Sequence, residues 1–218
     1  MRTNRTSNRR HRNVSPETLA RKAAKRQQLL DAADRAIRRK GPEVSMNEIA
    51  AEAATAKPVL YRYFGDKGGL YQAVAERYVQ LVMTAVREAM HEDADARKRL
   101  TAAIDAYLGL VESEPEIYRF LMHRAVNERA EAQATVADFI RQLGAEVASV
   151  LAEDLRRAGL DGHAAEPWAR GIVGMVQVSG DWWLESRSMT RERMVDHLVN
   201  LLWRGFAGLE APAMRQAT

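Results

Sequence analysis

The chain has 218 residues, of which 46% are hydrophobic and 28% are charged, so it has enough apolar material for a buried core. It contains no cysteine, which excludes disulfide bonds, a thiol nucleophile and cysteine-liganded metal centres. No apolar stretch approaches the roughly 18 residues that a membrane span needs, so we expect no membrane partner. The N-terminus also lacks the apolar core of a signal peptide.

Charge is distributed unevenly along the chain. Residues 1–70 hold 16 Lys or Arg against 7 Asp or Glu, whereas the remaining 148 residues hold 17 against 22, and the net charge is +4. A basic first third on an acidic remainder indicates that the N-terminal part binds a polyanion. The alternative is a basic tail that only keeps an ordinary protein soluble.

Apolar residues recur with the period of an α-helix in almost every segment, and no segment alternates as a strand does. Gly41-Pro42 ends the first helix, and Ser45 with Glu48 forms a capping box that begins the second. Pro58 is compatible with the first turn of the third helix, where no amide bond is lost. We predict helices at about residues 18–40, 45–53, 57–64, 68–91, 95–112, 115–125, 129–158, 164–186 and 190–208.

The second and third helices are short, lie inside the basic third and are joined by a tight turn, so they form a candidate helix-turn-helix. The major groove of DNA is about 12 Å wide and admits one helix, while the preceding helix crosses the backbone. The apolar positions of both helices fit a packed face. The side chains left to face outward are those of Lys57, Val59, Arg62 and Tyr63.

The same two segments resemble the signature of the TetR family of bacterial regulators. Residues 45–50 read Ser-Met-Asn-Glu-Ile-Ala, and residues 57–67 read Lys-Pro-Val-Leu-Tyr-Arg-Tyr-Phe-Gly-Asp-Lys. The Leu-Tyr-x-Tyr-Phe-x-x-Lys core of the second segment is highly specific. The Leu-Leu-Asp-Ala-Ala run at residues 29–33 and Gly41 match the family's first helix as well.

This resemblance implies a role for each matching position. Tyr61 and Lys67 match the family's phosphate contacts, and Ser45 matches the start of the second helix, where a hydroxyl and free amides meet a phosphate. Asn47 matches a position that reads bases in some members, and Arg62 either reaches a phosphate or turns away. The implied DNA-binding set is Ser45, Asn47, Lys57, Pro58, Val59, Tyr61, Arg62, Tyr63 and Lys67.

The turn departs from the family pattern. The family usually has Gly-Val-Ser where this chain has Ala54-Thr55-Ala56. Loss of the serine cap costs the third helix about 1 kcal/mol unless Thr55 replaces it.

The resemblance also implies an all-α fold with an N-terminal three-helix domain that contains the helix-turn-helix, followed by a six-helix regulatory and dimerisation bundle. We expect a disordered basic arm at residues 1–17, a DNA-binding domain at 18–67, a ligand-binding and dimerisation domain at 68–209, and a disordered tail at 210–218.

No catalytic motif is found. The chain contains no Gly-x-Ser-x-Gly, no Gly-x-Gly-x-x-Gly and no P-loop. The histidines at positions 11, 91, 123, 163 and 197 include no two at the spacing of metal ligands. We therefore expect no catalytic residue, no metal and no cofactor, and a protein that is not an enzyme.

The segment 166–185 is apolar around most of its circumference, apart from one narrow polar stripe, and the final helix has a similar character. A helix of this kind must be buried on two sides, so we predict that both helices pack against a second copy of the chain. The alternative is a deeply buried helix pair in a monomer. The predicted interface residues are Trp168, Ile172, Val176, Trp183, Leu198, Leu202 and Phe206.

The bundle carries more large apolar side chains than its seams need, which predicts an interior pocket with a few polar groups that orient a ligand. Asp181 is costly to bury within an apolar helix unless a group pairs with it. The alternative is that these residues are ordinary core and that Asp181 faces solvent. The predicted lining residues are Tyr107, Tyr118, Phe120, Met122, His123, Phe139, Leu143, Met175, Gln177, Asp181 and Trp182.

Two further segments, residues 117–120 and the Gly-x-x-Gly-Met run before Asp181, are weakly similar to TetR-family regulators of lipid metabolism in actinobacteria. This similarity implies a small lipophilic effector, with a fatty acyl compound as the first candidate. The family implies a ligand-responsive transcriptional regulator, most often a repressor, that binds a palindromic operator in double-stranded DNA as a homodimer in the bacterial cytoplasm.

The alternative is a small-molecule-binding or enzymatic helical protein whose basic N-terminus only steers it to acidic partners. Binding to a DNA fragment from beside its own gene would distinguish the two.

Overall fold

A computed structural model describes residues 15–91, 95–127 and 130–205, with side chains described for all of these except 123–127, 130–133 and 135. The described residues form nine α-helices, one short 3-10 helix and no strand, which confirms the prediction of an all-α fold. The helices are α1 (Pro16–Lys40), α2 (Met46–Glu52), α3 (Lys57–Phe64), α4 (Lys67–Met90), α5 (Ala96–Ser113), α6 (Pro115–Asn127), α7 (Ala130–Arg157), η1 (Gly162–Ala164), α8 (Ala165–Ser186) and α9 (Arg191–Arg204).

The ends of the fold differ from the predicted bounds. α1 begins at Pro16 because the Ser15 hydroxyl accepts the amide of Thr18 at 3.3 Å, so the predicted arm is wrong at its last two residues. α9 ends at Arg204 rather than at residue 208, because Gly205 takes a positive φ and its amide donates to the carbonyl of Leu201. Residues 1–14 and the predicted tail at 210–218 lie outside the described residues.

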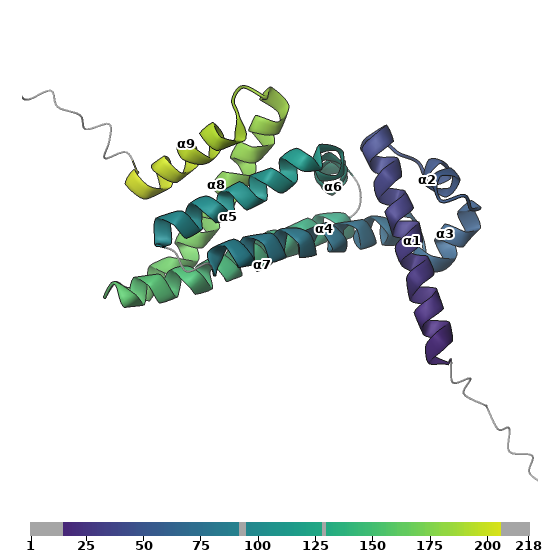
Figure 1. Ribbon diagram of the computed structural model, residues 1–218, viewed down its shortest axis with the longest axis horizontal. Helices are drawn as coiled ribbons and strands as arrows, with labels where there is room; N and C mark the ends of the chain where they lie inside the picture. Colours follow the sequence, from purple (N-terminus) through teal and green to yellow (C-terminus); the bar gives the residue numbers. More distant parts are fainter. Residues whose placement is uncertain (1–14, 92–94, 128–129, 206–218) are drawn as a thin grey trace, which may run out of the picture.

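α1, α2 and α3 pack into a small head at one end of the molecule (Figure 1). Its core unites Leu30 and Ile37 of α1, Ile49 of α2, and Leu60 and Phe64 of α3. Leu30 and Ile37 lie seven residues apart and Leu60 and Phe64 lie four apart, and both spacings place apolar side chains on one face of a helix.

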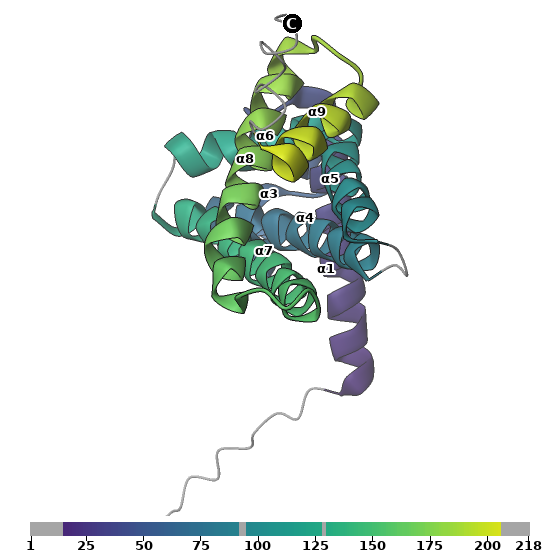
Figure 2. The same cartoon turned by 90° about the vertical axis from the view of Figure 1, so that its left-hand side faces the viewer.

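α4 leaves the head and runs into the bundle, where α7 lies alongside it (Figure 1). α5 packs on α4 and α9, and α8 packs on α7 (Figure 2). The bundle core includes Ile104 and Leu108 of α5, Val173 and Trp183 of α8, and Leu198 of α9. In the described part of the chain, no helix is both long and apolar enough to cross a membrane.

Two polar bridges join α1 of the head to the bundle side of the molecule. Arg77 of α4 lies 2.6 Å from a carboxylate oxygen of Asp34 and 2.7 Å from one of Asp31. Arg38 donates two hydrogen bonds to Glu114, at 2.6 and 2.8 Å, and we call this contact the Arg38–Glu114 bridge. Both bridges fix the tilt of the head against the bundle.

The turn between α2 and α3 is conformationally strained. Ala54 has a φ of +47°, in the left-handed region that favours glycine. Ala56 is the N-cap of α3 and makes no side-chain capping bond, so neither it nor Thr55 replaces the serine cap of the family.

Replacing Ala54 by glycine is therefore expected to stabilise the protein. A left-handed conformation costs an L-residue roughly 1–2 kcal/mol, so Ala54→Gly should raise the free energy of unfolding by about 1 kcal/mol. The matched control Ala51→Gly, at an exposed position inside α2, should lower it by roughly 0.5–1 kcal/mol. Urea denaturation followed by circular dichroism measures both, and equal effects of the two substitutions would contradict the strain.

Candidate nucleic-acid interface and interior cavity

α3 has one buried face and one outward face. Leu60 and Phe64, one turn apart, are 0% and 8% exposed in the head core. Tyr61, Arg62 and the preceding Pro58 are exposed. The helix thus presents a solvent-facing surface of the kind that enters a groove.

Cations lie over aromatic rings on this helix. The Lys57 ammonium lies 5.7 Å from the centre of the Tyr61 ring, and the Arg62 guanidinium lies 5.5 Å from that of Tyr63. Such contacts restrain long basic side chains on the outward face while leaving their charge near solvent. Val59 and Tyr63 are partly buried and pack against the head core, so they are the least outward of the predicted set.

The start of α2 is closed by the predicted capping box. The Ser45 amide and hydroxyl both donate to a Glu48 carboxylate oxygen, at 2.9 and 2.8 Å, and these bonds lower the pKa of Glu48. The amide and hydroxyl of Ser45 are therefore already hydrogen-bonded to the Glu48 carboxylate. A phosphate at this end of the helix would compete with Glu48 for these two donors. Asn47 is exposed in the first turn of α2, and Lys67 is exposed at the start of α4.

One basic surface near the head was missed by motif-based reasoning. The first turns of α1 project beyond the head (Figure 1), and Arg21 and Lys22 are exposed there. Their only signal in the sequence is the basic excess of the first third. They add positive charge beside the helix-turn-helix.

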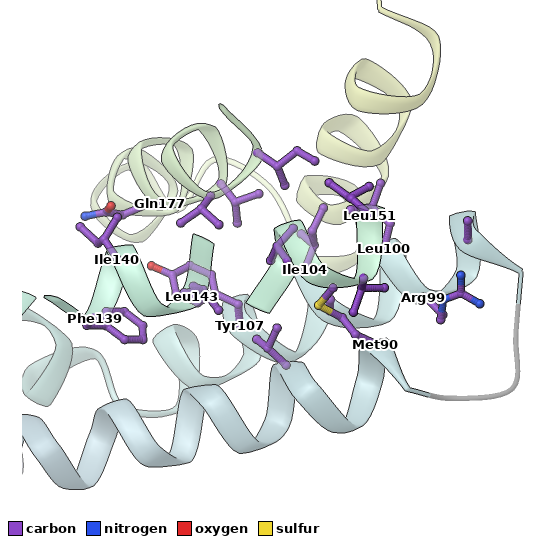
Figure 3. Close-up of a pocket in the computed structure, with 18 of the residues that line it drawn as sticks. Met90, Arg99, Leu100, Ile104, Tyr107, Phe139, Ile140, Leu143, Leu151 and Gln177 are labelled. Carbon is purple, nitrogen blue, oxygen red and sulfur yellow. The ribbon is translucent and has the colours of Figure 1, made fainter. Parts of the chain in front are cut away.

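The bundle encloses an apolar cavity of about 140 Å³ between α4, α5, α7 and α8. Its wall includes Val86 and Ile172, together with Ile104 and Leu143, which Figure 3 labels. A second lobe of about 70 Å³ lies nearer the head and shares five wall residues with the first: Tyr107, Tyr118, Met122, Val136 and Phe139.

A small polar cluster lies where the two lobes meet. The hydroxyls of Tyr107 and Tyr118 are 3.4 Å apart, and the Tyr118 hydroxyl donates to the carboxylate of Asp181. Burial raises the pKa of Tyr107 to about 12 and also raises the pKa of Asp181, although the Tyr118 hydrogen bond acts against the second shift. Together with Gln177, these hydroxyls are polar groups placed to orient a ligand.

Two families match this chain. Residues 29–74 match the family described as "Bacterial regulatory proteins, tetR family", and residues 85–216 match "Tetracyclin repressor-like, C-terminal domain". The chain belongs to the TetR family of bacterial transcriptional regulators. It is accordingly a DNA-binding regulator, and α2 and α3 lie within the residues that the first of these families matches.

Relatives of this TetR-family protein come from several bacteria. It is 36% identical over 189 residues to an uncharacterized HTH-type transcriptional regulator of Mycobacterium tuberculosis, covering 86% of this chain and 80% of the relative. It is 32% identical over 187 residues to the HTH-type transcriptional activator FasR of Mycolicibacterium smegmatis, covering 84% and 83%.

Among solved structures, it is similar to FadR of Bacillus subtilis in complex with stearoyl-CoA, with a TM-score of 0.65, 18% identity and coverage of 81% of this chain and 96% of FadR. A TetR-like regulator from Rhodococcus gives a TM-score of 0.64 at 28% identity, with coverage of 85% and 97%.

The structure brings only part of the predicted pocket together. Six predicted residues line the first lobe: Tyr107, Tyr118, Met122, Phe139, Leu143 and Gln177. Asp181 is connected to the cavity through Tyr118 rather than lining it. The side chain of His123 lies outside the described residues.

Three predicted pocket residues lie elsewhere. The prediction that Phe120 lines the pocket is wrong, because α6 places this side chain in the head core, where its ring centre lies 5.7 Å from that of Tyr71. The prediction for Trp182 is also wrong, because this side chain is 51% exposed on the outer face of α8. Met175 packs against the bundle core without lining the cavity.

The predicted dimer seam is also largely misplaced on α8 and α9. Trp183 is only 1% exposed, and its indole nitrogen donates to the carbonyl of Met189 within the same chain at 2.8 Å, so it cannot form an interface. Val176 and Leu198 are buried in the same core. Ile172 is partly buried at the cavity wall and Leu202 is partly buried, Trp168 is 53% exposed, and Phe206 lies outside the described residues.

The outward apolar face of α8 has a different phase. Its positions are Trp168, Gly171, Met175, Val178 and Trp182, at steps of three and four residues, with Trp168, Val178 and Trp182 between 51% and 68% exposed. We call this set the α8 stripe.

Among the described residues, no group of His, Asp or Glu could hold a metal ion.

The buried position of Asp181 predicts a pH-dependent stability. Because its pKa is raised in the folded state above the usual 3.8, the folded protein binds that proton more tightly than the unfolded chain. The resulting stability is fully present below about pH 4 and is lost as pH rises through the raised pKa.

Asp181→Asn should therefore gain stability relative to wild type between about pH 4 and pH 7, as measured by urea denaturation at each pH. The control Asp196→Asn, at an exposed position of α9, should run parallel to wild type. A constant difference between wild type and Asp181→Asn across this range would refute the shift.

Proposed function

We propose that this protein is a ligand-responsive repressor that binds a palindromic operator as a homodimer and releases it when a lipophilic effector binds. The observation that carries the proposal is an outward-facing α3 connected through α4 to an apolar cavity in the bundle. FasR carries the name of an activator, so the direction of regulation is tested by whether deletion of the gene raises or lowers expression from its operator.

In the complex, α3 would lie in the major groove, with Lys57, Pro58 and Val59 in its first turn next to the bases. Tyr61 and Lys67 would contact phosphates, consistent with their exposure. Asn47 and Arg62 would contribute at the edges of the groove, and Tyr63 would pack against the sugar and backbone.

The α8 stripe supports the homodimer. A row of apolar side chains at steps of three and four residues is the pattern of a helix that packs against another helix. Leu201 of α9 is also 39% exposed and would extend the seam. A two-fold dimer places two recognition helices on half-sites about 34–36 Å apart.

The cavity supports a lipophilic effector, because its described wall is almost entirely apolar and its polar groups gather where the two lobes meet. FadR of Bacillus subtilis was solved with stearoyl-CoA. A fatty acyl compound is therefore the effector class that we propose. The protein would act by binding rather than by catalysis, in the bacterial cytoplasm where its operator lies.

Release of DNA requires the effector to favour one of two arrangements of the reading heads. α4 carries wall residues of both lobes and begins at Lys67, so a shift of this helix moves the head. Coupling between sites in proteins is typically about 1–3 kcal/mol, or roughly 5- to 150-fold in affinity.

The DNA contacts predict two classes of variant. Lys67→Ala and Tyr61→Phe should weaken binding to the operator and to unrelated DNA alike, and Lys67→Ala should reduce the slope of log K against log salt by roughly 1 per lost phosphate contact. Lys57→Ala should instead change which base pairs are preferred. Fluorescence anisotropy with a DNA fragment from beside the gene measures all three.

The control for these variants is Lys98→Ala, which removes an exposed lysine of α5 in the bundle, outside the head. It should bind DNA as wild type does. Operator affinity that is independent of salt would contradict the phosphate contacts.

The α8 stripe predicts that Val178→Asp yields folded monomers. A charge buried in the seam should weaken the dimer by about hundredfold or more, so the monomer should bind the palindrome poorly. Light scattering after size exclusion gives the mass, and circular dichroism reports the fold. The control Leu160→Asp, at an apolar position that is 58% exposed away from the stripe, should remain dimeric; a monomeric wild type at micromolar concentration would refute the seam.

A further inference from the structure

One end of the apolar cavity is closed by an ion pair between α5 and α7. The Nη2 atom of Arg99 lies 2.7 and 2.6 Å from the two carboxylate oxygens of Asp154. Among the described wall residues these two are the charged ones, and they keep 16% and 23% of their side-chain surface exposed. Figure 3 shows Arg99 at this end, beside Met90 and Leu100, with Phe139 and Gln177 toward the other end.

The same ion pair forms a wall of a polar recess on the outside of the bundle. Met90, Arg99, Val150 and Asp154 line both the recess and the cavity, so the two spaces adjoin there. The recess is completed by the end of α4 and the last turns of α7, through His91, Ser149, Glu153, Arg156 and Arg157.

Among the described residues that line this recess, positive charge is in excess. Arg156 lies 2.6 Å from a carboxylate oxygen of Glu153, and Arg157 lies 3.1 Å from Glu153 and 3.6 Å from Asp154. Three guanidinium groups thus share two carboxylates. A further anion would be stabilised by them, since guanidinium groups bind carboxylate and phosphate oxygens with a matching planar geometry.

The opposite end of the apolar space carries the opposite charge. The second lobe follows α4 toward the head, past Val82 and Tyr78, and Glu114 is the charged side chain among its described wall residues. An anionic group at that end would be repelled by this carboxylate and would have to compete for Arg38. The two ends therefore differ in what they can accept.

We propose that the cavity binds a long-chain anionic amphiphile in one orientation, with its head group at Arg99 in the recess and its tail directed toward the second lobe. This inference rests on the proposed lipophilic effector and adds its charge and its direction. The shared chemistry is an acyl chain that ends in an oxyanion, either the carboxylate of a fatty acid or the phosphates of an acyl-coenzyme A.

In this orientation, the length of the acyl chain determines which of the two lobes the ligand fills. A short chain would fill the first lobe only, whereas a longer chain would reach the second lobe beside Tyr78 and Glu114, which both hold Arg38 of the head. Binding and release of DNA would then depend differently on chain length.

The head-group site is tested by comparing probes that share a chain and differ in charge. Wild type should bind palmitic acid about tenfold or more tightly than cetyl alcohol, because a charge-assisted hydrogen bond adds to the same apolar contacts. Palmitoyl-CoA in a parallel titration shows whether carboxylate or phosphate is preferred. Displacement of a fluorescent fatty-acid probe measures all three.

Arg99→Gln should remove most of the preference for palmitic acid and leave the affinity for cetyl alcohol unchanged. Because Arg99→Gln removes the nearer of the two arginines that pair with Asp154, the double variant Arg99→Gln with Asp154→Asn keeps a neutral, hydrogen-bonding pair and should show the same loss. The matched control Arg141→Gln removes an exposed arginine of α7 that lines neither the cavity nor the recess, and it should bind as wild type does.

The direction of the chain is tested at the other end. Val82→Phe fills the second lobe and should shift the preferred chain from stearic toward decanoic acid while retaining the preference for acid over alcohol. The control Leu81→Phe, at an exposed neighbouring position of α4, should change neither. A Val82→Phe variant that loses the preference for acid would show that the head group lies at the lobe end and would overturn the proposal.

Failure of the head-group site is distinguishable from failure of the proposed function. Equal binding of palmitic acid and cetyl alcohol, unaffected by Arg99→Gln, would overturn the head-group site and leave a lipophilic effector in place. Binding of none of the three probes would overturn both.

Discussion

The attachment of the head to the bundle through α1 and α4 constrains everything else in this molecule. Arg77 holds Asp34, which is 5% exposed, and the Arg38–Glu114 bridge holds α1 one turn further along the same helix. Burial raises the pKa of Asp34 against the influence of Arg77, so removing that arginine would leave a buried carboxyl without its partner and strongly destabilise the contact. These ion pairs add to the apolar packing of α4 and α6 on the head core, so a change in the bundle that reaches α3 would also move these contacts.

The apolar cavity in the bundle is connected to the head through α4. Its described wall is almost entirely apolar, so a lipophilic ligand that enters it removes apolar surface of both ligand and wall from water. This binding free energy can shift the head between two arrangements only to the extent that the ligand binds one of them more tightly than the other. Since α4 supplies part of the wall and also carries the head, the two are physically connected.

The sequence was most informative where a local motif determines local structure. Ser45 and Glu48 predicted the start of α2, and helical spacing predicted the buried positions Leu60 and Phe64 of α3, because capping and helical spacing act over a few residues. The outward face of α3 was predicted only in part, since Val59 and Tyr63 pack against the head core. It was least informative on α8, which is apolar on most sides. Nothing local distinguishes the side covered by the same chain, where Trp183 lies, from the side that holds the neighbouring Trp182. Phe120 was misplaced for a related reason, since only the tertiary packing of α6 on the head decides where it points.

The central claim is that a lipophilic anion bound in the bundle lowers the affinity of the head for its operator. The most direct test is fluorescence anisotropy of an operator fragment from beside the gene, titrated with the protein in the presence and absence of saturating palmitic acid or palmitoyl-CoA. Operator affinity should fall by about tenfold or more, and operator DNA should weaken effector binding by the same factor, because coupling between two sites is reciprocal. An effector that binds the protein and leaves operator affinity unchanged would contradict it.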